Sequence, residues 1–416
     1  MGRRVVVTSA GVLSPLGDSG AALHAALLAG RSGLSPVTLF PTDGLPPLLA
    51  GQLPGFDAAA YLGEGNLRPL DRISRIVTAA AERTLAAAGL PRALRAERLV
   101  GLEVGLVLGT MFSGITTIAE FDRRGLTRGP SYVSPLDFAN TVINAAAGQT
   151  AIWHDLRGIN TTVAGSAASG LQAIASAADS IRAGRADALL AGGADELSFE
   201  TLLGFHRAGY LCGEGEEPLP FDARRRGFAL SEGAALVLLE EAESAAVRGA
   251  RVLAEVRGHG AAFDRSRGAD PARSARAVAR AITIALEDAG VRPEEVDALS
   301  AAANGNLPGD AAEAAGIAAA LPGRAATLPV SAIRGLLGEA LGAAGACQVI
   351  DVLEAMGDGR LPGVAGFEGG DAGFPLLAVR AGSAEVRVRK ALINAMGLDG
   401  QHAALVLTLP EGAEGG

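Results

Sequence analysis

The segment Thr161–Gly170 (TTVAGSAASG) has the residue types of a nucleophile elbow, because a β-branched strand passes through small residues into a helix. Backbone amides at a helix N-terminus stabilise a thiolate or an oxyanion that is held against them. The apex of this elbow is Ala167, which cannot act as a nucleophile. Ser166 and Ser169 are the hydroxyl candidates that remain. Turn and helix-capping roles are the simpler interpretation of both serines, since no acid–base partner is evident beside them.

Side chains suited to metal or redox chemistry are few and scattered. Cys212 and Cys347 cannot form a disulfide framework, and five histidines show no spacing such as CxxC or HExxH. The sequence therefore predicts neither a metal site nor a cofactor. The formal net charge is −9, from 36 Lys plus Arg against 45 Asp plus Glu, and no basic block is evident. These values predict neither a nucleic-acid partner nor a membrane partner.

The composition predicts a packed protein. The 57 glycines and 20 prolines indicate many turns, and the 49% hydrophobic content is enough for a large core. The richest apolar stretch, Ser331–Met356, includes Arg334, Glu339 and Asp351, so it falls short of the roughly 18 uncharged residues of a membrane span and predicts a buried helix. The first strand begins near Val5, too early for a signal peptide. We expect a cytoplasmic protein.

Two pairs of similar segments predict an internal duplication. An amphipathic helix ends at Gly89 and another at Gly290, and each leads through a charged loop into an apolar strand. Each half also has a helix of small, uncharged residues, from about Ala167 to Ile181 and from about Leu341 to Met356, which must be covered on all sides. We predict a layered α/β/α/β/α body with a joint near 249–252, which divides the chain into halves 1–250 and 251–416.

Several motifs together resemble those of the β-ketoacyl-ACP synthases, in the order of that family and over almost the whole chain. The resemblance implies the thiolase fold, an internally duplicated structure that dimerises through its N-terminal half. The motifs are the elbow, Arg3–Gly17 (RRVVVTSAGVLSPLG), Asp71–Arg72, Phe221–Glu241 (FDARRRGFALSEGAALVLLEE) and Gly335–Gly345 (GLLGEALGAAG).

Members of that family condense acyl and malonyl thioesters with a cysteine and two histidines, and this chain has none of the three. Ala167 stands where the family has its cysteine, Asn304 and Glu339 stand at the two histidine positions, and Arg334 replaces an upstream lysine. Alanine cannot hold an acyl group, and asparagine has no titratable proton. A carboxylate at the third position would oppose the negative charge that develops on a decarboxylating malonyl thioester. The replacements exclude condensation, and we expect Arg334 and Glu339 to pair across the former pocket.

The family's access loop has also changed. The gating sequence G-F-G-G is replaced by Gly397–Gly400, with Leu398 and Asp399 at its centre, and the loop at Asn304 is two residues shorter than in the family. These changes predict that substrate access has been lost.

A ketosynthase-like chain without its triad resembles the chain length factor, the subunit that pairs with an active ketosynthase in type II polyketide systems. The resemblance implies a heterodimer with that ketosynthase, an acyl carrier protein that acts through the complex, and an acyl tunnel along the interface. In that family the elbow residue is commonly glutamine, where this chain has Ala167. The positions that correspond to the tunnel and to the loop that crosses the dimer are Met111, Phe112, Ile115, Thr116, Leu136, Asp137 and Phe138.

The leading hypothesis is a non-catalytic subunit that shapes the tunnel of its partner and thereby controls chain length. Core filling is the alternative role for Met111 and Phe112. Two other functions stay open at this point: an enzyme in its own right, either a malonyl-ACP decarboxylase or an acyl hydrolase that uses Ser166, and a homodimeric scaffold that binds carrier protein. The sequence does not indicate which polyketide is made.

Overall fold

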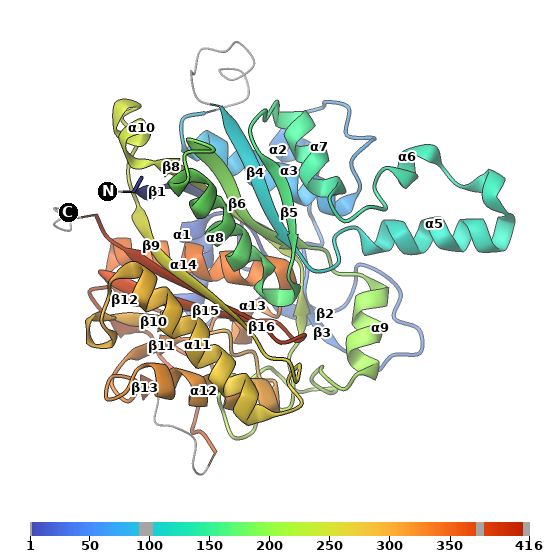
Figure 1. Cartoon of the computed structure of the whole chain (residues 1–416). Coiled ribbons are helices and arrows are strands. Elements are labelled where there is room, and N and C mark those ends of the chain that lie inside the picture. Colours follow the sequence, from blue (N-terminus) through green and yellow to red (C-terminus); the bar gives the residue numbers. More distant parts are fainter. Residues whose placement is uncertain (1, 91–102, 372–377, 411–416) are drawn as a thin grey trace.

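The protein is built around one mixed sheet of eleven strands (Figure 1). The computed structural model describes residues 2–90, 103–371 and 378–410. In spatial order, the N-terminal part of the sheet contains β5 (Asn160–Ala164), β4 (Val104–Thr110), β6 (Ala188–Asp195), β8 (Gly233–Glu241) and β1 (Val5–Leu13). The C-terminal part continues with β9 (Ala254–Phe263), β16 (Gln401–Thr408), β15 (Lys390–Met396), β10 (Ala298–Ser300), β11 (Pro329–Ser331) and β13 (Ala378–Val379).

The two parts repeat one topology. In the N-terminal part, β4 pairs in parallel with β5 and β6, and β8 lies antiparallel between β6 and β1. In the C-terminal part, β10 pairs in parallel with β11 and β15, and β16 lies antiparallel between β15 and β9. The predicted duplication is therefore confirmed. The division of the chain at residue 250 stays a prediction.

Five layers follow from the alternation of side chains along the strands. Leu189 and Leu405 pack in one central core with α8 (Ser169–Arg182), α14 (Ala344–Asp358) and α1 (Gly20–Leu28). Leu190 faces the opposite way, toward α3 (Arg72–Ala87) and α7 (Ala145–His154). On the other side of the molecule, Val406 packs against α11 (Pro271–Ala289) and α12 (Leu307–Ala320). The charge-poor helices α8 and α14 thus lie between the two parts of the sheet, as predicted.

Local sequence signals set the ends of the outer helices. The Asp71 side chain accepts a hydrogen bond from the Ser74 amide at the start of α3, and Asp270 accepts from Ala272 and Arg273 at the start of α11. Gly89 and Gly290 follow these helices with φ of 71° and 62°. These are left-handed conformations, which glycine adopts without the Cβ clash of other residues.

Short elements connect the layers and complete two small sheets, β2–β3–β7 and β12–β14. The helices are α2 (Ala58–Leu62), α9 (Phe199–Arg207), α10 (Ala242–Val247) and α13 (Arg334–Leu337), with one-turn 3₁₀ helices η1 (Pro130–Tyr132), η2 (Ser166–Ala168), η3 (Pro293–Glu295) and η4 (Leu341–Ala343). The strands are β2 (Leu34–Pro36), β3 (Leu49–Gly51), β7 (Leu230–Ser231), β12 (Arg360–Leu361) and β14 (Ala384–Glu385).

An arm formed by α5 (Ile115–Arg128), η1 and α6 (Pro135–Phe138) projects from the body (Figure 1). No residue of α5 is buried. The arm, the neighbouring helix α7 and the segment between α6 and α7 expose seven large apolar side chains, those of Leu126, Tyr132, Leu136, Phe138, Val142, Ile143 and Ile152. Apolar side chains gathered on one face mark an interaction surface more often than scattered ones do. Strand β5, which leads into the elbow, forms the edge of the sheet on this side of the molecule.

None of the helices in the described ranges is both long enough and apolar enough to cross a bilayer.

The buried histidine His24 joins α1 to α14 and gives the first testable prediction. Its Nδ1 lies 2.7 Å from Asp351 Oδ1 and its Nε2 lies 3.3 Å from Asp358 Oδ1. Burial alone would lower the pKa of His24, but the hydrogen bond and charge of Asp351, with the charge of Asp358, raise it above 6.5. A folded-state pKa above the unfolded value stabilises the protein fully below pH 6.5, and this contribution is lost as the pH rises through the folded value.

We therefore expect the difference in free energy of unfolding between the wild type and His24→Gln to be largest at pH 5.5 and to shrink steadily toward pH 8.5. Urea denaturation at four pH values measures it. A difference that is constant over this range would contradict the charged His24.

Candidate functional site

The predicted elbow is present and is buried. Strand β5 leads into η2, where Ser166 has φ of 56° and Ala167 is only 1% exposed. A non-glycine residue at positive φ is uncommon and marks a turn that the surrounding structure enforces. A second elbow stands before α14, where Leu341 at the start of η4 has φ of 49°. The duplication thus places two sharp turns in front of the two central helices.

Neither serine of the elbow is equipped to act as a nucleophile. The Ser166 Oγ donates to the Met111 sulfur at 3.9 Å, and a thioether is at most a weak acceptor, so it cannot remove the proton. The Ser169 Oγ is buried and has no hydrogen-bond partner among the described residues. The alternative hydrolase that uses Ser166 therefore lacks the base that it needs.

Asn304 and Glu339, the residues predicted to stand at the family's histidine positions, belong to one buried hydrogen-bonded group. Glu339 Oε2 accepts from Asn304 Nδ2 and from an Arg334 guanidinium nitrogen, both at 2.7 Å. Its other oxygen, Oε1, accepts from the Leu341 amide at 3.0 Å. Arg334 and Glu339 are each 1% exposed, so the predicted ion pair is present and is fully enclosed. We call Asn304, Arg334, Glu339 and Gln348 the internal polar cluster.

Gln348, on α14, completes the internal polar cluster from behind. Its Oε1 accepts from Arg334 at 3.0 Å, and its Nε2 donates to the Ala301 carbonyl at 2.8 Å. The internal polar cluster carries one positive charge, on Arg334, and one negative charge, on Glu339, and the two charges compensate each other in this buried site. Both oxygens of the Glu339 carboxylate are occupied. This arrangement fills a site; it does not present a free acid or base to a substrate.

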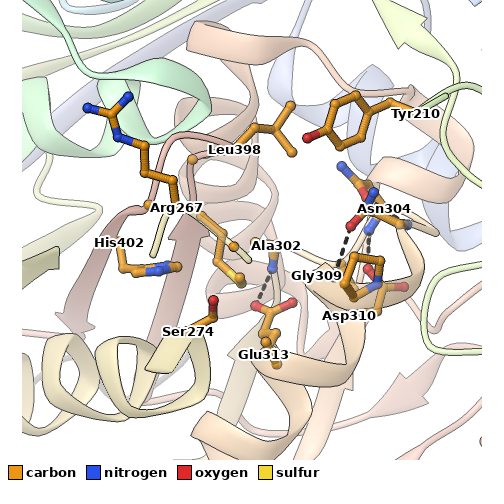
Figure 2. Close-up of a pocket in the computed structure, with 18 of the residues that line it drawn as sticks. Tyr210, Arg267, Ser274, Ala302, Asn304, Gly309, Asp310, Glu313, Leu398 and His402 are labelled. Atoms are coloured by element: carbon orange, nitrogen blue, oxygen red, sulfur yellow. Dashed lines mark hydrogen bonds between the residues drawn. The ribbon is translucent and has the colours of Figure 1, made fainter. Parts of the chain in front are cut away.

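A small cavity of about 110 Å³ lies beside the internal polar cluster. Figure 2 shows Tyr210, Leu398, Asn304, Glu313 and His402 around it. Burial lowers the pKa of His402 to about 4, so this histidine is neutral at pH 7. Burial raises the pKa of Glu313 to about 7, against the hydrogen bonds that its carboxylate accepts from Asn394 and Ala302. In the described part of the chain, no three acidic, histidine or cysteine side chains are placed to hold a metal ion.

Asp310, in the first turn of α12, fixes the shortened loop at Asn304. Its two carboxylate oxygens accept from the amides of Asn304 and Gly305, both at 3.1 Å, and from the Phe221 amide at 2.8 Å. Burial raises the pKa of Asp310 to about 6. The sequence did not indicate Glu313, which lies three residues later on the same face of α12 and also lines the cavity.

Three of the predicted tunnel residues and the two residues at the centre of the predicted gating loop come together in a larger groove of about 430 Å³, which we call the apolar groove. Met111, Phe112 and Ile115 form one wall, and Leu398 and Asp399 close one end. Helix α9 and the loop after it supply the opposite wall, which the sequence did not indicate: Glu200, Thr201, Gly204, Phe205, Ala208 and Tyr210. Tyr210 and Leu398 also line the smaller cavity, so the two spaces adjoin.

A buried carboxylate holds the wall of the apolar groove in place. Asp195, at the end of β6, accepts hydrogen bonds from the amides of Met111, Phe112 and Ser113 at 2.8 to 2.9 Å. It also accepts from the Thr110 hydroxyl and from the Gly342 amide in the second elbow, each at 2.8 Å. Burial raises the pKa of Asp195, and these donors act in the opposite direction. One side chain therefore ties the groove to the second elbow.

The other predicted residues lie elsewhere, so the set does not form one tunnel within this chain. Thr116 and Asp137 line a separate cavity of about 370 Å³ at the base of the arm. Its wall includes Glu196, whose pKa burial raises to about 7 and whose Oε1 accepts from the Thr116 amide. Leu136 and Phe138 are 52% and 60% exposed on α6. The helical turn at the start of α5 separates Ile115 from Thr116, because adjacent helical residues point in different directions.

The duplicated sheet, the five layers and the buried elbow define the class: this is a thiolase-fold protein. Residues 2–245 match the family described as "Beta-ketoacyl synthase, N-terminal domain", and residues 253–368 match "Beta-ketoacyl synthase, C-terminal domain". The chain therefore belongs to the β-ketoacyl synthase family.

Its relatives include 3-oxoacyl-[acyl-carrier-protein] synthases and a putative polyketide β-ketoacyl synthase. It is 33% identical to "3-oxoacyl-[acyl-carrier-protein] synthase 2" of Coxiella burnetii, over 98% of each chain. It is 36% identical to "Putative polyketide beta-ketoacyl synthase 2" of Streptomyces coelicolor, over 97% of this chain and 95% of that protein. A similar solved structure, "The ishigamide ketosynthase/chain length factor", has a TM-score of 0.90 at 31% identity and covers 99% of this chain and 100% of that one.

Proposed function

We propose that this chain is a chain length factor: a non-catalytic subunit that pairs with an active ketosynthase and shapes the acyl tunnel at their interface. The observation that carries the proposal is the internal polar cluster, together with Ala167 at the elbow. Every catalytic position of the family is occupied by a residue that cannot perform its step, and the replacements satisfy one another. A protein that keeps the fold and the elbow, but whose former catalytic site is filled by the internal polar cluster, is suited to be a structural subunit.

The chemistry supports the absence of condensation by this chain alone. Condensation needs a nucleophile that carries the acyl group and donors that stabilise the enolate formed on decarboxylation. Ala167 supplies no nucleophile. The Asn304 amide donates to Glu339, so it is not directed at a substrate oxygen. The same arrangement weighs against a malonyl decarboxylase, because a carboxylate would face the developing enolate.

The exposed apolar surface supports a protein partner. The arm, α7 and the edge strand β5 lie on one side of the molecule (Figure 1). An edge strand with unpaired backbone groups is a template for pairing with another chain, and the arm places Leu126, Leu136 and Phe138 where that chain would cover them. The structure named for a ketosynthase and chain length factor, at a TM-score of 0.90, supports an active ketosynthase as this partner.

A basic surface supports the expected carrier protein. Arg265, Arg273, Arg276 and Arg280 line a groove of about 430 Å³ between α11 and the end of β9. The sequence did not show this cluster as a block, because helical spacing brings together residues that are separated along the chain. A carrier protein bears a phosphopantetheine group, and its phosphate charge would be attracted to this surface.

Co-purification tests the proposal. The chain should be co-expressed with an intact Cys-His-His ketosynthase, with a tag on one subunit only. We expect a stoichiometric heterodimer, disrupted by Phe138→Asp on the arm and unaffected by Val247→Asp, a change of an even more exposed apolar residue on α10. A stable homodimer that does not bind the ketosynthase would overturn the proposal and favour the alternative of a homodimeric scaffold.

Restoring the nucleophile alone should not restore activity. We expect Ala167→Cys to show no condensation above background when it is supplied with acyl and malonyl carrier proteins. The new thiol would lie at the elbow, but Asn304 and Glu339 still lack acid–base function. Mass spectrometry of the carrier proteins measures both acyl transfer and condensation. Turnover by Ala167→Cys would show that the internal polar cluster is compatible with catalysis and would contradict this proposal.

A further inference from the structure

The walls of the apolar groove are unusually poor in hydrogen-bond donors. Met111, Phe112, Ile115, Phe205, Ala208 and Leu398 contribute apolar surface. The amides of Met111 and Phe112 are already used by Asp195, and the Thr201 hydroxyl donates to the Ser198 carbonyl at 3.0 Å. Glu200 and Asp399 accept hydrogen bonds but donate none when ionised. Among the described side chains that line the groove, only the Tyr210 hydroxyl is a donor without a recorded acceptor.

This distribution discriminates between two kinds of acyl chain. A poly-β-keto chain has a carbonyl on every second carbon, and each carbonyl that packs against the apolar side chains of the groove loses contact with water on that side. One buried carbonyl without a donor lowers affinity about tenfold or more, whereas one buried methylene raises it about fourfold. Glu200 and Asp399 add to the discrimination, because β-dicarbonyl carbons are acidic and their enolates would be repelled by carboxylates.

The aromatic rings give the groove a shape that suits an apolar chain. Phe112 and Phe205 are 6.2 Å apart with planes at 79°, and Phe205 and Tyr210 are 6.0 Å apart at 71°. Edge-to-face packing fixes these rings against one another. The rings therefore present fixed apolar surfaces, and an extended hydrocarbon chain would make van der Waals contact with them.

We propose that the apolar groove accommodates an acyl chain without ketones along its length, a saturated or polyunsaturated one, and that it excludes a poly-β-keto chain. The inference rests on the proposed function, because the chain must be delivered by a partner ketosynthase. It names the substrate class that the sequence did not indicate. The groove adjoins the smaller cavity beside the internal polar cluster through Tyr210 and Leu398.

The test compares two carrier-bound primers of equal length in the purified heterodimer: octanoyl and 5-oxo-octanoyl. We expect kcat/KM for one extension to be at least tenfold higher for octanoyl. Equal or better extension of the ketone would overturn the inference. Heterodimer formation and extension of an acetyl primer, which has no hydrocarbon chain beyond its methyl group, are measured first. Failure of these two measurements would count against the proposed function; normal results without discrimination would count only against the substrate class.

A variant of the apolar groove tests whether this subunit causes the preference for octanoyl over 5-oxo-octanoyl. Ala208→Ser adds a hydroxyl donor to the wall of the groove, and we expect it to reduce the octanoyl preference at least threefold. Val247→Thr, a similar polar change on α10 outside the groove, should leave the preference unchanged. An unaltered preference in Ala208→Ser would place the selectivity in the partner and overturn the inference.

Discussion

Glu339→Ala will lower the free energy of unfolding by about 3–5 kcal/mol, because it leaves the Arg334 charge buried without a counter-charge. Arg334 is only 1% exposed, so its charge has almost no contact with bulk solvent. The variant also removes the acceptor of the Asn304 amide and of the Leu341 backbone amide at the second elbow. Urea or thermal denaturation of the isolated chain measures the loss.

Two further variants show whether the buried charge is responsible. Glu214→Ala removes an exposed carboxylate from a surface loop and should change stability by less than about 0.5 kcal/mol. The double variant Arg334→Met with Glu339→Gln removes both charges and keeps an amide acceptor, so it should recover most of the loss, since uncharged replacements of buried pairs are often neutral. A double variant as unstable as Glu339→Ala would show that packing dominates and the charge does not.

The sequence predicted the parts of this structure that local signals determine. Gly89 and Gly290 marked helix ends, and the charge-poor helices after the two elbows indicated a central layer. The ion pair of Arg334 and Glu339 was also predicted, because both residues stand at positions that a shared motif brings to one site.

Contacts between distant segments could not be predicted in the same way. Gln348 joins the internal polar cluster from α14, and α9 forms half of the apolar groove, although neither stood in a motif. The predicted tunnel residues were treated as one set because the family resemblance placed them together. The structure instead places Ile115 at the apolar groove, Thr116 at the cavity beside the arm and Phe138 on the exposed surface of α6, and only the three-dimensional path of the chain shows this.

Asp195 is the strongest example of a residue that sequence reasoning missed, and replacing it should have the largest effect on the groove. Asp195 lies at the end of an apolar strand, and a single acidic residue at such a position usually indicates the start of a surface loop. Instead it is fully buried and accepts from five donors, which belong to the loop after β4 and to the second elbow. The side chain thus replaces the solvent that a loop of free amides would otherwise require.

We expect Asp195→Ala to lower the free energy of unfolding by about 4 kcal/mol or more, because each buried donor left without an acceptor costs about 1–3 kcal/mol and only some can regain one by relaxation. Met111 and Phe112 would also lose their fixed positions, so in the heterodimer the preference for octanoyl over 5-oxo-octanoyl should fall. Asp187→Ala, at the residue just before β6, removes an exposed ion pair with Arg3 and should cost less than about 1 kcal/mol. If Asp195→Ala proved as mild as Asp187→Ala, the loop would have another support, and the wall of the groove would not depend on this carboxylate.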